Sequence, residues 1–334
     1  MHRVLFVRTD RLGETLLTLP ALHAIRQAYP DAHLLLLVHP ALRDLFADHP
    51  DVNEVVAESQ SSGPWWLVAW RTALRWRSWH PDTVIISNPK RAYHLGAWLA
   101  GIPERVGWDR KWGWLLTRRL EDRKHLGDYH EVEYNLLLVG TLRIPALPAP
   151  VPWLPGGRHG ERTLSDLLSR KGIGRTRAVV AVHPWTSNPN KQWPMHNFQA
   201  LIHQLAQQSG LATLVIGGPE ERAHMDALQM EPAEAVNCVG ALSLPELADV
   251  LRQVHVLVTN DSGPMHMAAA VGTPVVALFG TGDSGSHPRR WGPWGTGHTV
   301  IHKPLNQITV DEVARAVMRY TASKGSLEAG ASGS

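Results

Sequence analysis

The sequence has one cysteine, no long hydrophobic run, and few tyrosine or phenylalanine residues. The single Cys238 excludes a disulfide framework and is typical of a protein in a reducing compartment. No apolar stretch approaches the roughly 20 residues that span a bilayer, and the amino terminus enters a strand pattern, VLFVR, without the layout of a signal peptide. Together these absences predict a cytoplasmic protein.

The charge and the histidines exclude two further classes. A net charge of +3 is small for a nucleic-acid-binding protein of 334 residues. The 19 histidines are scattered and show no helical ligand spacing, so we expect no metal site. Tryptophan, by contrast, is abundant, with 14 residues against five Tyr and four Phe. The positions of the tryptophans therefore carry information about function.

Short runs rich in Val, Ile and Leu alternate with helical patterns along the chain. In the first half, strands are expected at 4–8, 33–38, 53–56, 83–87 and 105–108, and helices at 65–79 and 91–101. In the second half, strands are expected at 178–183, 212–218, 235–240, 254–259 and 274–280, and helices near 195–209, 219–229, 244–253 and 264–271. Strands that are apolar on both faces and alternate with helices indicate parallel sheets covered on both sides.

A Pro- and Gly-rich stretch at 144–162 separates these two sets. The pattern predicts an α/β protein with two doubly wound, Rossmann-like domains, 1–155 and 156–324, that face each other across a cleft. The low-complexity tail at 325–334 is expected to be disordered. Ligands of doubly wound sheets bind outside the carboxyl ends of the strands, so we expect the active site in the cleft.

Two strand-to-helix turns in the second half have the composition of a phosphate site. The strand AVVAVHPW is followed by Thr186, Ser187, Asn188 and Lys191. The strand VHVLVTN is followed by Asp261, Ser262, Gly263 and Pro264, which open the helix MHMAAAVG. Backbone N–H groups at such turns point at one place, where an anion is favoured. Two turns in one domain predict a diphosphate that is held from two sides.

The opening segment, VRTDRLGETLLTLPALHAIRQAYPDA, resembles that of the heptosyltransferase family, glycosyltransferase family 9. The family's carboxyl-terminal domain is resembled by HPWTSNPNKQWP, LVIGGPEE, VGALSLPELADVL and VTNDSGPMHMAAAVGTPVVALFG. The resemblance runs from about residue 3 to 320, with a poorly matched middle at 60–165. It implies a GT-B fold, an acceptor-binding first domain and a nucleotide-sugar-binding second domain. It also implies inverting transfer of a sugar, typically a heptose from an ADP-activated donor, to a lipopolysaccharide core-type acceptor.

Inverting transfer requires a base for the acceptor hydroxyl and positive charge for the leaving diphosphate. Glu14 is the candidate base, although the family usually has Asp there; Asp10, or a plain helix-start carboxylate at Glu14, are the alternatives. Lys191 is expected to neutralise the diphosphate, with a solvated loop lysine as the alternative. Asp261 is expected to bind hydroxyls of the transferred sugar, as the matching residue does in the family, or to cap the following helix.

The other expected donor contacts lie in the same turns and in nearby loops. The diphosphate is assigned Thr186, Ser187, Ser262, Gly263, Pro264, Met265 and His266. The ribose is assigned to Glu220 or Glu221, and the base to Leu242 with its neighbours Ser243 and Leu244. The alternative is that these residues have structural roles: they cap helices, pack in the core or stand as acids in the first turn of a helix. These residues also do not distinguish adenine from uracil as the base. We expect no cofactor or metal, because the donor itself is a nucleotide-sugar substrate.

The acceptor side is predicted from Trp and basic residues. In the segment 64–81, a helix places Trp66, Ala69, Ala73 and Trp76 on one face, which is typical of a membrane-surface helix or of a domain helix with Trp packed inward. A second set is expected to bind an acidic saccharide: Lys90, Arg91, Arg105, Arg110, Lys111, Arg118 and Arg119, with Trp108, Trp112 and Trp114. We therefore expect an anionic saccharide or lipid-linked acceptor, peripheral contact with the inner face of the cytoplasmic membrane, and no nucleic acid.

Other functions stay open on the sequence alone. A nucleotide-sugar epimerase shares the two-domain architecture and the diphosphate site but needs no acceptor. A saccharide- or lipid-binding protein keeps the cleft without turnover. A third alternative is a transferase that uses another nucleotide sugar and a different acceptor. The sequence leaves the sugar, the acceptor hydroxyl and the oligomeric state undetermined.

Overall fold

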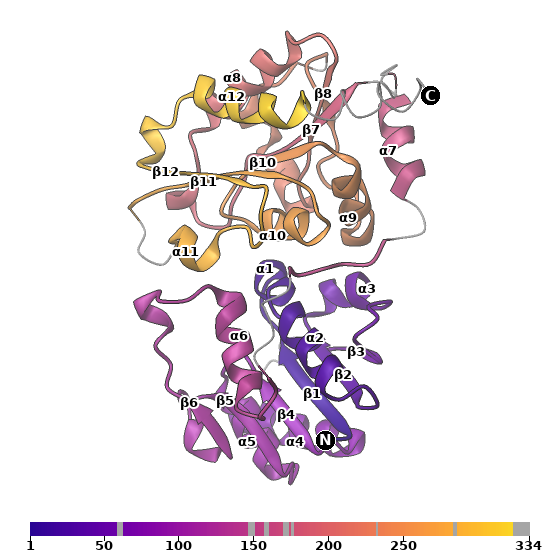
Figure 1. Ribbon diagram of the computed structural model, residues 1–334, viewed down its shortest axis with the longest axis vertical. Helices are drawn as coiled ribbons and strands as arrows, with labels where there is room; N and C mark the ends of the chain where they lie inside the picture. Colours follow the sequence, from indigo (N-terminus) through magenta and orange to yellow (C-terminus); the bar gives the residue numbers. More distant parts are fainter. Residues whose placement is uncertain are drawn as a thin grey trace. The chain divides into compact units, whose positions relative to one another are not determined.

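The chain forms two compact units, Met1–Pro155 and Gly156–Ser334 (Figure 1). The computed structural model describes residues 1–58, 63–145, 151–156, 160–169, 174, 177–231, 233–282 and 286–322. The division coincides with the predicted boundary, inside the Pro- and Gly-rich stretch at 144–162. The tail expected to be disordered, 325–334, lies outside the described residues.

The first unit is built on a parallel sheet of order β3-β2-β1-β4-β5-β6. Its strands are β1 (Arg3–Arg8), β2 (His33–Val38), β3 (Glu54–Ala57), β4 (Thr83–Ile86), β5 (Glu104–Trp108) and β6 (Arg118–Leu120). Its helices are α1 (Leu12–Leu16), α2 (Leu19–Ala28), α3 (Arg43–Phe46), α4 (Trp65–Trp79), α5 (Arg91–Leu99) and α6 (Glu131–Gly140), with short 3-10 turns η1 (Pro40–Leu42), η2 (Gly113–Leu115) and η3 (Lys124–Leu126). The five predicted strands are confirmed, whereas β6 and α6 were not predicted.

Helices α4 and α5 cover one face of this sheet and pack against each other. Trp76 of α4 is fully buried, and its ring lies 5.6 Å from that of Tyr93 in α5. The two helices approach closely at Gly96, where a Cβ atom would lie only 2.8 Å from Cγ2 of Thr72. The predicted helix at 65–79 is therefore a domain helix with one inward face.

The prediction of that inward face was wrong for one residue. Ala69, Ala73 and Trp76 are buried as expected, but Trp66 keeps 57% of its surface exposed. It lies in the first turn of α4, ahead of the Ala69 to Thr72 turn that meets Gly96. The close contact with α5 starts only after this first turn, so Trp66 stays outside the core.

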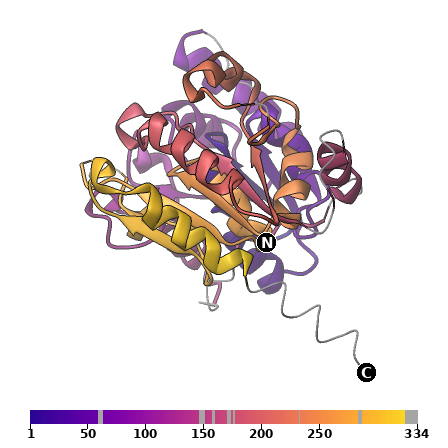
Figure 2. The same cartoon turned by 90° about the horizontal axis from the view of Figure 1, so that it is seen from above.

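The second unit is built on a parallel sheet of order β12-β11-β10-β7-β8-β9. Its strands are β7 (Ala178–His183), β8 (Leu211–Val215), β9 (Val236–Asn237), β10 (Val256–Asn260), β11 (Val275–Phe279) and β12 (Thr299–His302). Its helices are α7 (Gly160–Ser169), α8 (Met195–Ala206), α9 (Leu244–Gln253), α10 (Gly263–Ala270), α11 (Pro288–Trp291) and α12 (Val310–Thr321), with 3-10 turns η4 (Pro189–Lys191), η5 (Pro219–Leu228) and η6 (Leu305–Gln307). Helices α8 and α12 lie side by side on one face of the sheet (Figures 1 and 2). Strand β12 and helix α12 were not predicted, and β9 is shorter than the predicted strand at 235–240.

Both sheets follow one topology. In each, the first strand of the unit (β1 or β7) pairs on one side with the second and on the other with the fourth (β4 or β10). The strand order therefore reverses between β1 and β4, and again between β7 and β10. Ligands of doubly wound sheets bind at this switch point, outside the carboxyl ends of the strands. The residues that follow these four strands are therefore the candidates for function.

Candidate active site

At the switch point of the second unit, the predicted diphosphate and sugar residues come together. Asp261 follows β10 directly, and Nζ of Lys191 donates to its Oδ2 at 2.9 Å. The Thr186 hydroxyl donates to the backbone carbonyl of Asp261 at 3.1 Å, and the hydroxyl of Ser286 donates to Oδ2 of the same carboxylate. The loops after β7 and β10 thus meet as predicted. Ser286 was missed, because it lies far along the chain in a segment without a periodic pattern.

A buried asparagine holds these two loops in register. Asn260, the last residue of β10, is fully buried. Its Nδ2 donates to the carbonyl of Pro184 at 2.8 Å, and its Oδ1 accepts from the backbone N–H of Trp193 at 2.9 Å. Trp193 is itself fully buried and packs edge-on against Phe198. The segment that carries Lys191 is therefore anchored at both ends.

Helix α10 begins at this place. Ser262 precedes the helix with extended backbone, and its hydroxyl lies 2.8 Å from that of Thr259. Pro264 occupies the second helical position, where the N–H that proline lacks would have no partner within the helix. The side chains of Met265 and His266 are buried at 0% and 4% exposure. The burial of His266 favours the packing role over the diphosphate contact.

Of the residues assigned to the ribose and the base, Glu221 is engaged within the protein. Glu221 accepts from the backbone N–H of Gly218, and its Oε1 lies 3.5 Å from Nε2 of His183. Burial opposes ionisation of Glu221, but the contacts with His183 and Gly218 outweigh it and lower its pKa. Glu220 is exposed and Leu242 is half-buried. Both ribose assignments and the base assignment stay predictions.

Ser243 has a separate structural role. It caps α9 in a capping box with Glu246, whose carboxylate accepts from the Ser243 N–H at 2.8 Å.

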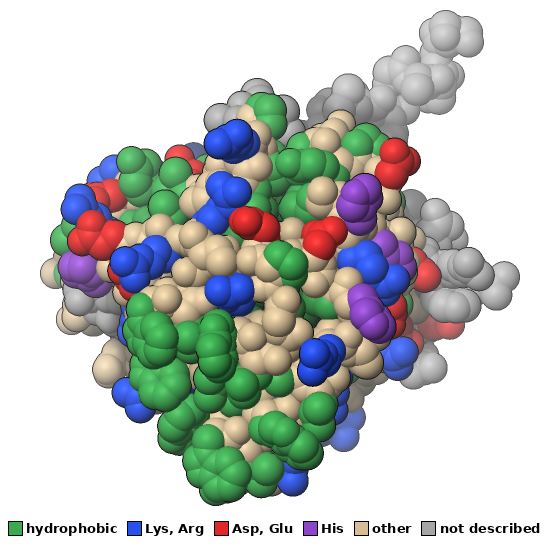
Figure 3. Space-filling view, turned by 90° about the horizontal axis from the view of Figure 1, so that it is seen from below, with side chains coloured by type: hydrophobic (Ala, Val, Ile, Leu, Met, Phe, Trp, Pro, Cys, Tyr) green, Lys and Arg blue, Asp and Glu red, His purple; other side chains and the backbone are tan. Residues whose placement is uncertain are grey.

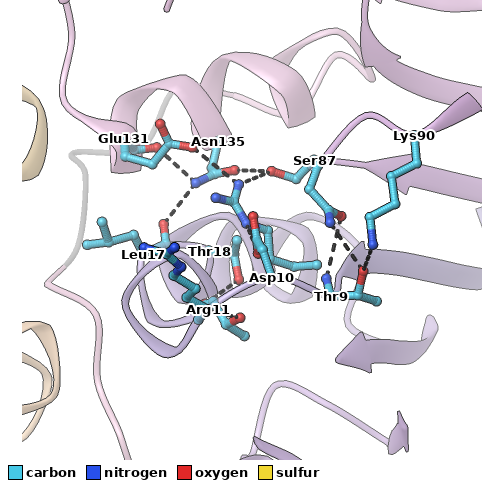
Figure 4. Close-up of polar contacts among 12 residues, drawn as sticks. Thr9, Asp10, Arg11, Leu17, Thr18, Ser87, Lys90, Glu131 and Asn135 are labelled. Carbon is cyan, nitrogen blue, oxygen red and sulfur yellow. Dashed lines mark hydrogen bonds and ion pairs between the residues drawn. The ribbon is translucent and has the colours of Figure 1, made fainter. Parts of the chain in front are cut away.

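At the switch point of the first unit, a buried arginine organises a polar network (Figure 4). Arg8 ends β1, and its Nε donates to Oδ1 of Asp10 at 2.8 Å. Its Nη1 donates to the Ser87 hydroxyl at 2.7 Å and to Oε1 of Glu131 at 3.2 Å. The side chains of Arg8 and Glu131 retain only 4% and 1% exposure. Two buried charges thus neutralise each other where the strand order reverses.

The network extends to α6 and to the end of α1. Lys124 Nζ donates to Oε1 of Glu131 at 2.6 Å. The Ser87 hydroxyl donates to Oδ1 of Asn135 at 2.6 Å, and Nδ2 of Asn135 donates to the carbonyl of Leu17 at 3.2 Å. None of these residues was predicted from the sequence. The only available sign was Arg8 itself, a charge at the end of an otherwise apolar strand.

Of the basic residues predicted for an acidic saccharide, Lys90 lies beside this network. Its Nζ donates to the Thr9 hydroxyl at 3.1 Å, and burial lowers its pKa. The tyrosine hydroxyl of Tyr93 lies 2.8 Å from the same Thr9 oxygen. The end of β1 and the start of α5 therefore present a cation and two hydroxyls together.

Most of the other predicted basic residues do not form one site. Arg110, Arg118 and Arg119 pair with Asp122, Glu104 and Asp109, respectively. Arg105 donates to the backbone carbonyls of Leu115 and Ile102. Trp108 is buried at 2% exposure, with Lys124 over its ring at 4.6 Å. The prediction of a single basic cluster was wrong, because neighbouring acids and carbonyls satisfy these side chains.

Glu14 lies in the first turn of α1 and is half-buried. Burial raises its pKa, and the nearby charge of Asp10 raises it further, while Arg8 and Arg11 act in the opposite direction. A carboxylate with a raised pKa is a stronger proton acceptor than an exposed one. Among the residues that the structure describes, no three His, Cys, Asp or Glu side chains gather as a metal site.

The chain is similar to glycosyltransferases in sequence and in structure. Residues 95–316, more than half of the chain, match the family model of glycosyltransferase family 9 (heptosyltransferase). Lipopolysaccharide heptosyltransferase 2 of Escherichia coli K12 is 25% identical over 292 residues, which cover 83% of this chain and 82% of that protein.

Two solved structures show the same fold. The family 9 glycosyl transferase of Veillonella parvula superimposes with a TM-score of 0.84 at 21% identity, over 96% of this chain and 97% of the other. The E. coli ADP-heptose lipopolysaccharide heptosyltransferase II superimposes with a TM-score of 0.80 at 21% identity, over 97% and 100%. The two parallel sheets therefore have the GT-B fold, and the chain belongs to glycosyltransferase family 9, the heptosyltransferase family.

Proposed function

We propose that this glycosyltransferase moves a heptose from ADP-heptose, with inversion, to a hydroxyl group of a lipopolysaccharide core-type saccharide acceptor. The observation that carries the proposal is the Lys191–Asp261 pair at the switch point of the second unit, within a chain of this family. The names of its relatives support the donor and the acceptor class. Family membership also favours transfer over the epimerase and the binding protein without turnover.

The second unit binds the donor in this proposal. Lys191 neutralises the charge that develops on the diphosphate when the bond between the anomeric carbon and the diphosphate oxygen breaks. Thr186, Ser187 and the backbone N–H groups at the start of α10 donate to the same oxygens. Asp261 accepts hydrogen bonds from hydroxyls of the transferred sugar. This cationic setting supplies the charge stabilisation, so we propose that transfer needs no metal or cofactor.

The first unit supplies the base. Glu14 takes the proton from the acceptor hydroxyl while the hydroxyl oxygen attacks the anomeric carbon. The raised pKa of Glu14 supports this role, because a stronger base removes the proton more readily. Asp10 is the alternative base, but the Arg8 guanidinium holds its carboxylate at 2.8 Å. Lys90 is proposed to bind the anionic acceptor, and the buried hydroxyls of Thr9 and Tyr93 position its ammonium group.

The donor is tested first by thermal shift against ADP-, UDP-, GDP- and dTDP-linked sugars. A ligand that binds only the folded state raises the melting temperature, by an amount set by its concentration relative to its Kd. We expect the largest rise with ADP-heptose. A larger rise with another nucleotide would contradict the ADP assignment and leave the transferase class intact.

Transfer is tested by incubating ADP-heptose with heptose-deficient lipopolysaccharide core and identifying the product by mass spectrometry. Nuclear magnetic resonance of the anomeric proton then reports whether the configuration has inverted. A parallel reaction without acceptor is the control for epimerisation, because an epimerase changes the donor alone. Activity that survives EDTA supports the metal-free mechanism, whereas loss of activity that Mg²⁺ restores would contradict it.

A further inference from the structure

Five tryptophans with large exposed areas lie on one part of the first unit. Trp65, Trp66 and Trp70 of α4 retain 42%, 57% and 54% exposure, Trp98 of α5 retains 51%, and Trp114 of η2 retains 66%. Trp is a large apolar ring with one polar N–H group, so exposing so many of them to water is costly. In Figure 3 hydrophobic side chains gather over a broad area of this unit, with Lys and Arg around it.

Ring contacts link α4 to the segment around η2. The ring of Trp65 meets Trp112 edge-on at 4.9 Å, and Trp112 lies 6.2 Å from Trp114. Trp66 and Trp70 lie four residues apart, and Leu74, 51% exposed, continues this stripe along α4. We call this surface the tryptophan face: Trp65, Trp66, Trp70, Leu74, Trp98, Trp112 and Trp114.

Helix α5 joins the same surface. Nδ1 of His94 contacts the carbonyl of Lys111 at 2.9 Å, which ties α5 to the segment that carries Trp112. Trp98 lies one helical turn after His94, on the same side of α5.

Basic residues predominate around the tryptophan face, although the exposed Asp109 lies against Gly113 between Trp112 and Trp114. The 15 residues of α4 include Arg71, Arg75 and Arg77 and no acid, and all three arginines are exposed. Helix α5 begins with the exposed Arg91 and has no acid, and Lys111 is exposed beside Trp112. Arg75 has one distant acid, Glu58, at 4.0 Å. Apolar rings surrounded by cations match the headgroup region of an anionic bilayer, where Trp and Tyr are enriched and basic residues are attracted.

We propose that the tryptophan face docks the protein on an anionic phospholipid bilayer. No helix in the described part of the chain is long and apolar enough to cross a membrane, so this contact is peripheral. A second copy of the chain fits less well, because a two-fold contact would bring the arginines of both copies together. Docking does not depend on which sugar the enzyme transfers. Its consequence for the proposed function is that a lipid-linked acceptor is met at the membrane surface.

The full-length protein is tested by co-sedimentation with vesicles of phosphatidylcholine alone and with 30% phosphatidylglycerol. We expect binding to the anionic vesicles that weakens at high salt, since each basic residue near an anionic surface contributes roughly a fivefold gain. The variant Trp66→Ser/Trp70→Ser/Leu74→Ser should lose at least about tenfold in partition coefficient. Arg71→Gln/Arg77→Gln should lose binding to anionic vesicles most strongly at low salt.

Matched controls come from the same unit. Trp153 is 55% exposed but lies beside His49, outside the tryptophan face, so Trp153→Ser should bind like the wild type. Arg43→Gln is the corresponding charge control, at an exposed position of α3. Circular dichroism melting shows that the variants fold. Vesicle binding uses no donor or acceptor, and the face variants should keep full transfer to a soluble acceptor, so failure of docking is distinguishable from failure of the proposed function.

Three results would overturn the proposal. The first is a wild-type protein that sediments with neither kind of vesicle. The second is equal loss of binding in Trp153→Ser and in the face variant. The third is a dimer in analytical ultracentrifugation that the face variant converts to a monomer while vesicle binding is unchanged, which would assign the face to a second copy.

Discussion

The Lys191–Asp261 pair has two possible roles, and removing its members singly and together separates them. The atoms lie 2.9 Å apart, and the side chains retain 22% and 11% exposure. An exposed pair is worth about 0–1 kcal/mol, whereas removing one partner of a buried pair costs about 3–5 kcal/mol. Lys191→Ala should therefore cost about 1–3 kcal/mol of the free energy of unfolding. We expect this cost to stay below that of a fully buried pair, because Ser286 still donates to the Asp261 carboxylate in the variant.

The effect on catalysis should be larger. A donor aimed at charge that develops in the transition state contributes about 3–4 kcal/mol, which corresponds to a fall of roughly 100- to 1,000-fold in kcat. In Lys191→Ala/Asp261→Asn no unpaired charge remains, so stability should return to within about 1 kcal/mol of the wild type. Catalysis should stay impaired, because the diphosphate still lacks its cation.

The assays are guanidinium unfolding and initial rates of transfer for each single variant and the double variant. Lys303→Ala is the matched control, since Lys303 pairs with Glu312 in the same unit, with side chains 34% and 32% exposed. This control should lose at most about 1 kcal/mol and retain full activity. If the double variant recovers activity together with stability, the pair is structural and Lys191 is not the counter-charge.

Three further outcomes are expected. Glu14→Gln should lower kcat roughly 100- to 10,000-fold while the thermal shift with donor is kept, and a loss below tenfold would contradict its role as base. In pH–rate profiles, Asp10→Asn should move the acid limb of kcat/KM to lower pH and Arg11→Gln should move it to higher pH, because the charge of Asp10 raises the pKa of Glu14 and that of Arg11 lowers it; shifts in one common direction would be inconsistent with Glu14 as the titrating group. Trp76→Ala should cost about 3–5 kcal/mol of unfolding free energy in urea titrations, since the side chain is fully buried, and a cost below about 1 kcal/mol would show that the site collapses.

The fold could be predicted from the sequence where burial is two-sided. Strand β1 is buried in all but its first residue, and such runs of Val, Leu and Phe are visible without a structure. The strands at the edges of the sheets were harder to predict. The β6 segment, Arg118–Leu120, is partly exposed and contains two arginines, and β12 pairs with a single neighbour. Edge strands bury fewer side chains, so their composition resembles that of loops.

The site could be predicted only in part, for a related reason. Lys191, Thr186 and Asp261 follow strands that the sequence shows clearly, and the structure joins them. Glu131 and Ser286 come from segments without a clear pattern, and they reach the switch points only through tertiary packing. Residues that act beside a strand end are visible in sequence, whereas those that reach the same place from elsewhere need the fold.

In both units, a buried polar side chain at the end of one central strand is hydrogen-bonded to the residue that follows the other central strand. At a switch point the connections that leave the two central strands run in opposite directions. The backbone N–H and C=O groups of these loops therefore lack the hydrogen-bond partners that a regular sheet or helix provides. Arg8 ties the end of β1 to Ser87 after β4, and Asn260 ties the end of β10 to Pro184 after β7. Because these ties lie within the protein itself, they favour a binding site whose loops are arranged without the use of binding energy. In the proposed function, the buried polar ties at the strand ends therefore hold the short segments that carry Lys191 and Glu14 in fixed positions.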